Sequence, residues 1–238
     1  MYQNITNQPV GAQTTINNAL ENARFIQRVY SWMTIGLLLT AVVAYFVSET
    51  TEAINLIFSS RWNFYMLLIA QLGAVVYLSA MISKMRASTA TFVFLGYSVL
   101  SGITFSAIFL VFTLSSIGMT FAITAGMFGI MSLYGYVTKT DLTTVGNIAF
   151  MGLIGIILAS LVNLFFQNPM ADWIITYVGI IVFVALTAYD TQKIKEYNII
   201  GNEGTEDDHK ESIMGALTLY LDFVNLFLKL LNLFGKRR

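Results

Sequence analysis

The chain has 238 residues, of which 56% are hydrophobic and only 11% charged, and its formal net charge is zero. A soluble domain carries about 25% charged residues, so this composition indicates a membrane protein and gives no sign of nucleic acid as a partner. The absence of cysteine excludes disulfides, thiolate catalysis and cysteine-ligated metal.

A polar leader opens the chain. Residues 1–22 are rich in Asn, Gln and Thr, and we expect them to be largely disordered. The apolar stretch that follows Arg24 and Arg28 has no clear small-residue cleavage site, so we expect it to stay in the protein as a signal anchor.

Seven apolar stretches are long enough to cross a bilayer, which takes about 20 residues per helix. In chain order they lie near residues 29–48, 62–82, 90–113, 117–137, 146–166, 173–191 and 213–234. None alternates apolar and polar residues as barrel strands do, and water cannot satisfy backbone groups inside a bilayer, so we expect packed helices. The predicted fold is an all-α membrane protein with a seven-helix transmembrane domain at 23–235 and a basic tail at 236–238.

Positive charges orient the predicted bundle. One side carries Arg24, Arg28, Lys84, Arg86, Lys139, Lys193 and Lys195, whereas the loops of the opposite side carry Glu49, Glu52, Arg61 and Asp172. The positive-inside rule therefore predicts a cytoplasmic N-terminus. The basic tail at 236–238 does not fit the positive-inside rule, because seven crossings place it outside the cytoplasm. Either it is translocated despite its charge or the last segment is re-entrant, and about 22 apolar residues favour a full crossing.

Small residues recur at four-residue spacing in several spans, which lets helix backbones approach closely. They are Ser98, Gly102 and Ser106, then Ala122 and Gly126, then Gly155 and Ala159. We interpret all of them as packing positions.

Only three residues inside the apolar spans are charged: Asp190, Asp222 and Lys229. An ionised carboxylate in hydrocarbon costs several kcal/mol unless a partner or water relieves it, so each acid predicts a functional site. On the last span, Thr218, Asp222, Asn225 and Lys229 follow one another at offsets of four, three and four residues and form one polar stripe. A helix that is apolar apart from such a stripe should be central, with the stripe facing protein or water. Thr187 and Asp190 form a similar pair on the preceding span.

If the two stripes face each other, Asp190 and Asp222 share one small volume. Like charges a few Å apart in a low dielectric cannot both ionise cheaply, so the two acids should share a proton at moderate pH. Hard cations such as calcium favour carboxylate oxygens. Asp190 and Asp222 would therefore be metal ligands, and calcium and the proton should compete for their oxygens. The pattern therefore predicts a pH-gated cation site.

Other interpretations of these residues stay open. Asp190 lies only three residues before Lys193 and could be an interfacial acid. The two acids meet only if the last helix begins above the membrane surface, for which the polar segment 201–212 leaves room. We expect the acidic segment 203–211, with His209, to be a solvated loop.

Lys229 also has two interpretations. A lysine in a seventh helix could form a retinal Schiff base, but Asp222 lies seven residues away, about 10 Å along the axis, which is far for a counter-ion. Snorkelling of Lys229 to the headgroups is the interpretation we favour. Intramembrane aspartyl proteolysis would need a Gly-x-Gly-Asp motif at the second acid, and Leu-Tyr-Leu precedes Asp222 instead. We therefore expect no enzyme.

Two segments carry a family resemblance. They are LTAYDTQKI at 186–194 and GALTLYLDFVNLF at 215–227, supported by SGIT at 101–104 and GMFG at 126–129. Together they resemble the paired signature segments of the transmembrane Bax inhibitor motif family, with the bacterial members most similar.

The resemblance implies a seven-helix fold with the last helix surrounded by the others, and a pH-sensitive calcium leak with Asp190 and Asp222 as its proton sensor. It also implies that a basic residue at the cytoplasmic end of the second helix latches the closed pore. That residue would be Lys84 or else Arg86. The alternative for both is anchoring under the positive-inside rule.

The function expected from the sequence is a passive cation leak in a bacterial cytoplasmic membrane, with calcium as the transported ion and no cofactor. Its partners would be the lipid bilayer, calcium and protons. Two alternatives are a non-transporting regulator of another membrane protein, such as a protease or survival factor, and a proton-coupled carrier for a small solute.

Overall fold

A computed structural model describes residues 10–238, except the side chains of residues 10–16, Arg61 and Phe64. Over this range the chain forms eight helices: α1 (Val10–Glu49), α2 (Thr51–Phe58), α3 (Arg61–Met81), α4 (Ala87–Val111), α5 (Leu114–Val137), α6 (Thr143–Phe166), α7 (Pro169–Tyr197) and α8 (Glu206–Phe234). The extended pairing within the described range is a single bridge between Phe112 and Arg237. The all-α class expected from the sequence is confirmed.

Six of the helices are long and apolar enough to cross a membrane. These candidate spans are Asn17–Glu49, Ala87–Val111, Leu114–Val137, Thr143–Phe166, Pro169–Tyr197 and Glu206–Phe234, and α3 adds the shorter apolar stretch Tyr65–Met81. Large apolar side chains such as Leu164, Phe165 and Phe166 are exposed on the outside of the bundle, as lipid contact requires. The chain is a multi-pass membrane protein. The short helix α2 was not expected from the sequence.

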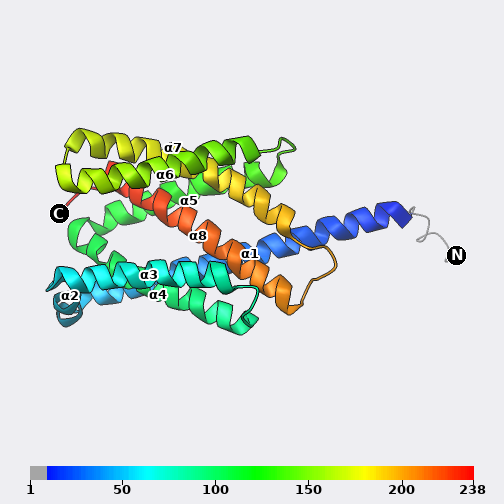
Figure 1. Cartoon of the computed structure of the whole chain (residues 1–238), viewed down its shortest axis with the longest axis horizontal. Helices are drawn as coiled ribbons and strands as arrows, with labels where there is room; N and C mark the ends of the chain where they lie inside the picture. Colours follow the sequence, from blue (N-terminus) through cyan, green and yellow to red (C-terminus); the bar gives the residue numbers. More distant parts are fainter. Residues whose placement is uncertain (1–9) are drawn as a thin grey trace.

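The helices run back and forth between two ends of the bundle (Figure 1). The connections α3–α4, α5–α6 and α7–α8 lie at the end from which α1 projects, which we call the N-terminal end. Helix α2, the α4–α5 and α6–α7 connections and the C-terminus lie at the other, C-terminal end. The basic residues that the sequence assigns to one side are therefore at one end of the molecule.

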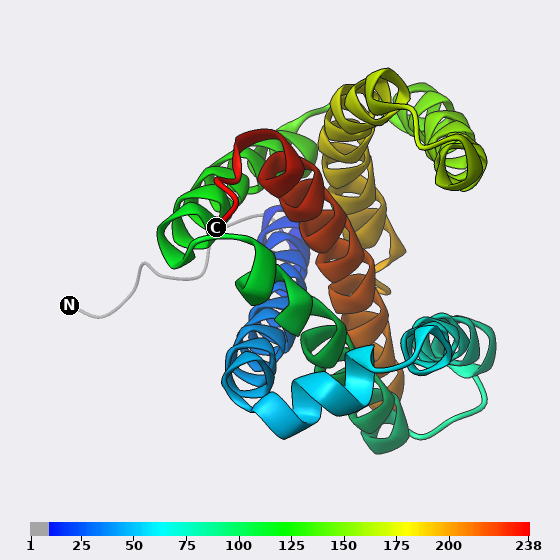
Figure 2. The ribbon, with the colours of Figure 1, turned by 90° about the vertical axis from the view of Figure 1, so that its left-hand side faces the viewer.

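Helix α8 is the most buried of the candidate spans. It packs against α1, α4, α5 and α7, and Figure 2 shows it running between these helices. Ile213, Leu219 and Tyr220 are fully buried on it. The Tyr220 hydroxyl lies 2.7 Å from Thr40 Oγ1 of α1. Helix α8 is apolar on nearly all of its faces, and such a helix is expected to be buried on several sides.

The prediction that small residues mark close helix contacts is confirmed at Gly102 on α4 and is wrong at Gly126 and Gly155. A Cβ atom at Gly102 would lie 2.7 Å from the Thr40 carbonyl oxygen of α1, so these backbones touch only because position 102 is glycine. By contrast, a Cβ atom at Gly126 or Gly155 would meet nothing within 4 Å. Those two glycines lie on surfaces without a close neighbour in the described chain.

Part of α1 and the C-terminal tail each contact a connection between helices of the bundle. Helix α1 begins at Val10, so the second half of the predicted leader is helical, and residues 1–9 lie outside the described residues. Glu21 and Asn22 hold this part by accepting hydrogen bonds from Gly201 N and Asn198 Nδ2, respectively, in the α7–α8 connection. Helix α8 ends at the opposite end from its start and does not turn back, contrary to the re-entrant alternative. The tail then pairs with the α4–α5 connection, where Thr113 N donates to Lys236 O.

The acidic segment before the last span is not a solvated loop. Glu206 already begins α8, and Thr205 caps it by accepting a hydrogen bond from Asp208 N. Asp208 is 2% exposed and forms a bidentate ion pair with Arg28 of α1, at 2.7 and 2.9 Å. His209 is half-buried, lies 2.9 Å from Thr91 Oγ1 and packs edge-on against Trp32. The negative charges at the start of α8 also suit the helix dipole, so these residues fix its N-terminal turns against α1 and α4.

Candidate functional site

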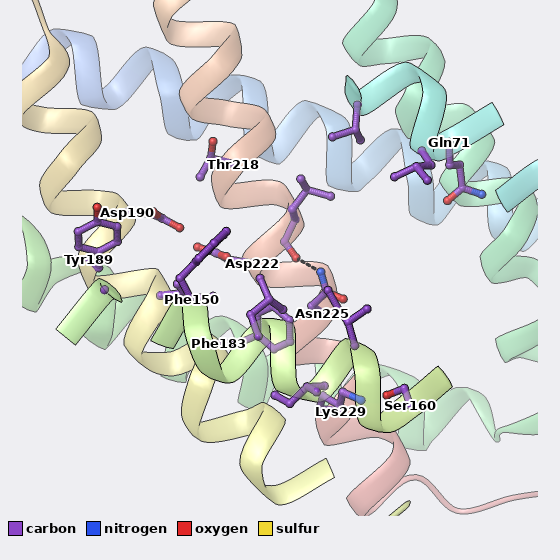
Figure 3. A pocket seen from close by; sticks show the side chains of 18 of the residues that line it. Gln71, Phe150, Ser160, Phe183, Tyr189, Asp190, Thr218, Asp222, Asn225 and Lys229 are labelled. Carbon is purple, nitrogen blue, oxygen red and sulfur yellow. Dashed lines mark hydrogen bonds between the residues drawn. The ribbon is translucent and has the colours of Figure 1, made fainter. Parts of the chain in front are cut away.

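The two membrane acids come from neighbouring helices and point toward each other (Figure 3). Asp190 lies seven residues before the end of α7, and Asp222 lies sixteen residues after the start of α8. The carboxyl groups are close enough to interact directly. Asp222 is 5% exposed, and Asp190 is half-buried. Asp222 is thus nine residues farther from the α7–α8 connection along its helix than Asp190 is, and α8 crosses the bundle obliquely to bring the two acids together (Figure 1).

One oxygen of the pair has no donor. Asp222 Oδ2 is buried and has no hydrogen-bond partner among the described residues. Its neighbour is another carboxyl group, which can donate only when it carries a proton. A single proton held between the two acids would give the buried oxygen its hydrogen bond and remove one of the two negative charges. An arriving cation could do the same.

The acids border a cavity of about 1000 Å³ between α3, α6, α7 and α8, which is open toward the outside of the bundle where exposed side chains such as Leu72 and Leu164 line it. Thr218, Asn225 and Lys229 of the α8 stripe line it as well, and its walls are mostly apolar side chains of α3 and α6, such as Val75 and Phe150. The Thr218 hydroxyl donates to Met214 O, and Asn225 Nδ2 donates to Leu221 O at 2.8 Å. Because both donors are used on the helix backbone, the side-chain oxygens of Thr218 and Asn225 remain free to accept.

A second cavity, of about 270 Å³, lies between the acids and the N-terminal end of the bundle. It is lined by Lys193 and Glu211, which come from the outer parts of α7 and α8. Tyr189, Asp190 and Thr218 line both this cavity and the large one. Asp190 therefore borders both cavities and Asp222 borders the large one; we call this place between α7 and α8 the junction.

The donor set suits a weakly held hard cation. Calcium takes six to eight oxygen ligands at roughly 2.3–2.6 Å. Beside the two carboxylates, the α8 stripe offers the Thr218 hydroxyl and the Asn225 amide oxygen. Within residues 10–238 no group of three or more His, Cys, Asp or Glu side chains is arranged to hold a metal ion. Water would have to complete the shell of any ion bound here.

Three other predicted residues lie away from the acid pair. Thr187 is fully buried, donates to Phe183 O at 2.7 Å and does not line the large cavity. Lys84 and Arg86 are exposed in the α3–α4 connection, and neither forms an ion pair with another described residue. Their role as a latch stays a prediction.

Sequence reasoning missed the cavity-lining residues Gln71, Asn147 and Ser160, and it also missed Asn232 further along α8. Gln71 of α3 lines it and donates to Thr104 Oγ1 of α4. The sequence could have pointed to Gln71, because it is a polar amide inside the apolar stretch 62–82. Asn232 continues the α8 stripe three residues beyond Lys229, so the same offset rule would have found it.

Comparisons with known proteins agree with the family resemblance. Residues 22–238 match the family model described as inhibitor of apoptosis-promoting Bax1. The chain is 54% identical over 215 residues to the inner membrane protein YbhL of Escherichia coli, covering 90% of this chain and 92% of YbhL. It is 45% identical to an uncharacterized protein of Borreliella burgdorferi, covering 90% and 93% of the two chains. An uncharacterized protein of Rickettsia prowazekii is 43% identical, with 90% of each chain covered.

Proposed function

Because this chain belongs to the Bax inhibitor-1 family, we propose that it is a pH-sensitive calcium leak channel of a bacterial inner membrane. In this proposal the bundle crosses the membrane seven times around a central α8, with the N-terminus in the cytoplasm. The observation that carries the proposal is the position of Asp190 and Asp222, face to face at the junction between α7 and α8.

The closed state is the one in which the acids share a proton. The proton joins α7 to α8 through a hydrogen bond between the two carboxyl groups, and it leaves only one negative charge in the cavity. A cation that reaches the acids from either cavity then meets the protonated pair, beside Tyr189 and Thr218. In this state calcium does not pass.

Loss of the shared proton opens the junction. Two unit charges 4 Å apart repel each other by about 4 kcal/mol at an effective dielectric constant of 20, which is enough to shift a balance between two packings of α7 against α8. A divalent cation between the carboxylates cancels the repulsion, so calcium is drawn to the junction when the proton leaves. Lys84 or Arg86 remains the proposed latch of the closed state.

The test is calcium entry into liposomes that contain the purified protein, followed with a trapped fluorescent indicator over a series of pH values. We expect the rate to be low in acid and to rise toward alkaline pH, because the sensor must lose its proton before calcium binds. Empty liposomes give the background at each pH. A rate that stays flat, or that falls as the pH rises, would refute the proposal.

A further inference from the structure

The polar stripe of α8 continues beyond the acid pair toward the C-terminal end of the bundle. Asn225, Lys229 and Asn232 follow Asp222 at offsets of three, four and three residues. Asn232 Nδ2 donates to Thr176 Oγ1 of α7 at 2.9 Å and lies 3.4 Å from Asp172 Oδ2. A third cavity, of about 230 Å³, is lined by Asp172, Thr176 and Asn232, and by Arg237 of the C-terminal tail. The stripe thus leads from the large cavity to a polar cavity at the other end of the molecule.

Lys229 lies on α8 between the acid pair and the residues of the third cavity. It lines the large one, and the next residue of the stripe, Asn232, lines the third. Asn232 and Thr176 are hydrogen-bonded to each other across α7 and α8, and both line the third cavity. A cation that leaves the acid pair along the stripe therefore reaches Lys229 before it reaches the third cavity.

The position of the Lys229 side chain is fixed by packing. A Cβ atom at Gly179 of α7 would lie 3.0 to 3.2 Å from the Cε, Cδ and Cγ atoms of Lys229, so the alkyl stem lies directly on this glycine. The charged residues that line the large cavity are Asp190, Asp222 and Lys229. No described carboxylate lies within ion-pair distance of the Lys229 ammonium group. Its charge is therefore not cancelled by a contact; the Asp172 carboxylate of α7 acts on it electrostatically from beyond ion-pair distance, and Asp222 lies about 10 Å away along the helix.

We propose that Lys229 is a charge barrier at the C-terminal end of the cation pathway, and that it sets both the rate and the choice of ion. This inference rests on the proposed function, since it concerns the same cavity. A fixed positive charge repels a divalent cation twice as strongly as a monovalent one at the same distance. Lys229 therefore slows calcium more than potassium and keeps the open pathway a slow leak.

The test compares wild type with Lys229→Met and Lys229→Arg in proteoliposomes at alkaline pH, with calcium and potassium entry measured separately. Methionine keeps most of the stem on Gly179 and removes the charge, whereas arginine keeps the charge. We expect Lys229→Met to raise calcium entry about tenfold and potassium entry less, and Lys229→Arg to behave like wild type. Lys229→Gln gives the same comparison if the methionine variant does not fold.

The outcomes separate the barrier from the proposed function. Calcium entry that is unchanged or reduced in the neutral variants, or raised equally by Lys229→Arg, would overturn the barrier even if wild type responds to pH as proposed. Calcium entry that rises in the neutral variants while wild type shows no pH dependence would support the barrier and refute the pH gate. Entry at the level of empty liposomes in all variants would overturn both.

Discussion

Replacing Asp222 by Asn should abolish the pH dependence of calcium entry and lower the alkaline rate by at least about tenfold, the loss expected for an essential charged ligand. Asparagine has nearly the shape of aspartate but cannot ionise, and its amide can donate a hydrogen bond to Asp190 at every pH. The junction between α7 and α8 therefore stays closed, and the cation loses one of its two carboxylates. The measurement is the same liposome assay over the full pH series.

The matched control for this variant is Asp207→Asn. Asp207 lies on the same helix, is exposed and pairs with Lys210 at the surface, so its replacement should leave the pH profile unchanged. Asp190→Asn should act like Asp222→Asn, and the double variant should add little, because the pair works as one unit. A pH profile retained in Asp222→Asn would contradict the assignment of the sensor.

Replacing Gly135 by Ala should destabilise the protein and reduce calcium entry together. A Cβ atom at Gly135 of α5 would overlap with the carbonyl oxygen of Ala188, which lies on α7 two residues before Asp190. A backbone atom cannot move aside as a flexible side chain can, so we expect a cost of about 1–3 kcal/mol. The readouts are the unfolding temperature in detergent and the liposome assay.

Gly129→Ala is the matched control on the same helix. A Cβ atom there would meet nothing within 4 Å, and alanine is the better helix former by up to about 1 kcal/mol. This variant should be as stable as wild type or more stable, with normal calcium entry. If Gly135→Ala behaves like Gly129→Ala, then α5 does not press on α7 beside Asp190.

The sequence was most informative where a physical requirement acts on single residues. The apolar stretches predict the helices because backbone groups inside a bilayer must form hydrogen bonds within the chain. Each of the seven predicted stretches lies on one of the observed helices. Asp190 and Asp222 stand out because charge is costly in lipid, and the repeating offsets of the α8 stripe place Thr218 and Asn225 on one face with Asp222. These inferences need no knowledge of how the helices pack.

Features that depend on partners distant in the sequence could not be predicted in this way. The acidic segment before the last span resembles a solvated connector until Arg28, about 180 residues earlier, is seen to pair with Asp208. His209 is half-buried because Trp32 and Thr91 happen to lie beside it. For the same reason, glycine spacing predicts close packing at Gly102 correctly and at Gly126 wrongly, since spacing does not say which face of a helix has a neighbour.

The central claim is that Asp190 and Asp222 share one proton whose loss opens the pathway. Infrared difference spectroscopy of the membrane-embedded protein follows the carbonyl stretch of a protonated carboxyl group as the pH is raised. We expect one such band in wild type, lost over the same pH range in which calcium entry begins, and a different titration in Asp222→Asn. A band that titrates identically in wild type and Asp222→Asn, or that disappears well below the pH at which entry begins, would contradict it.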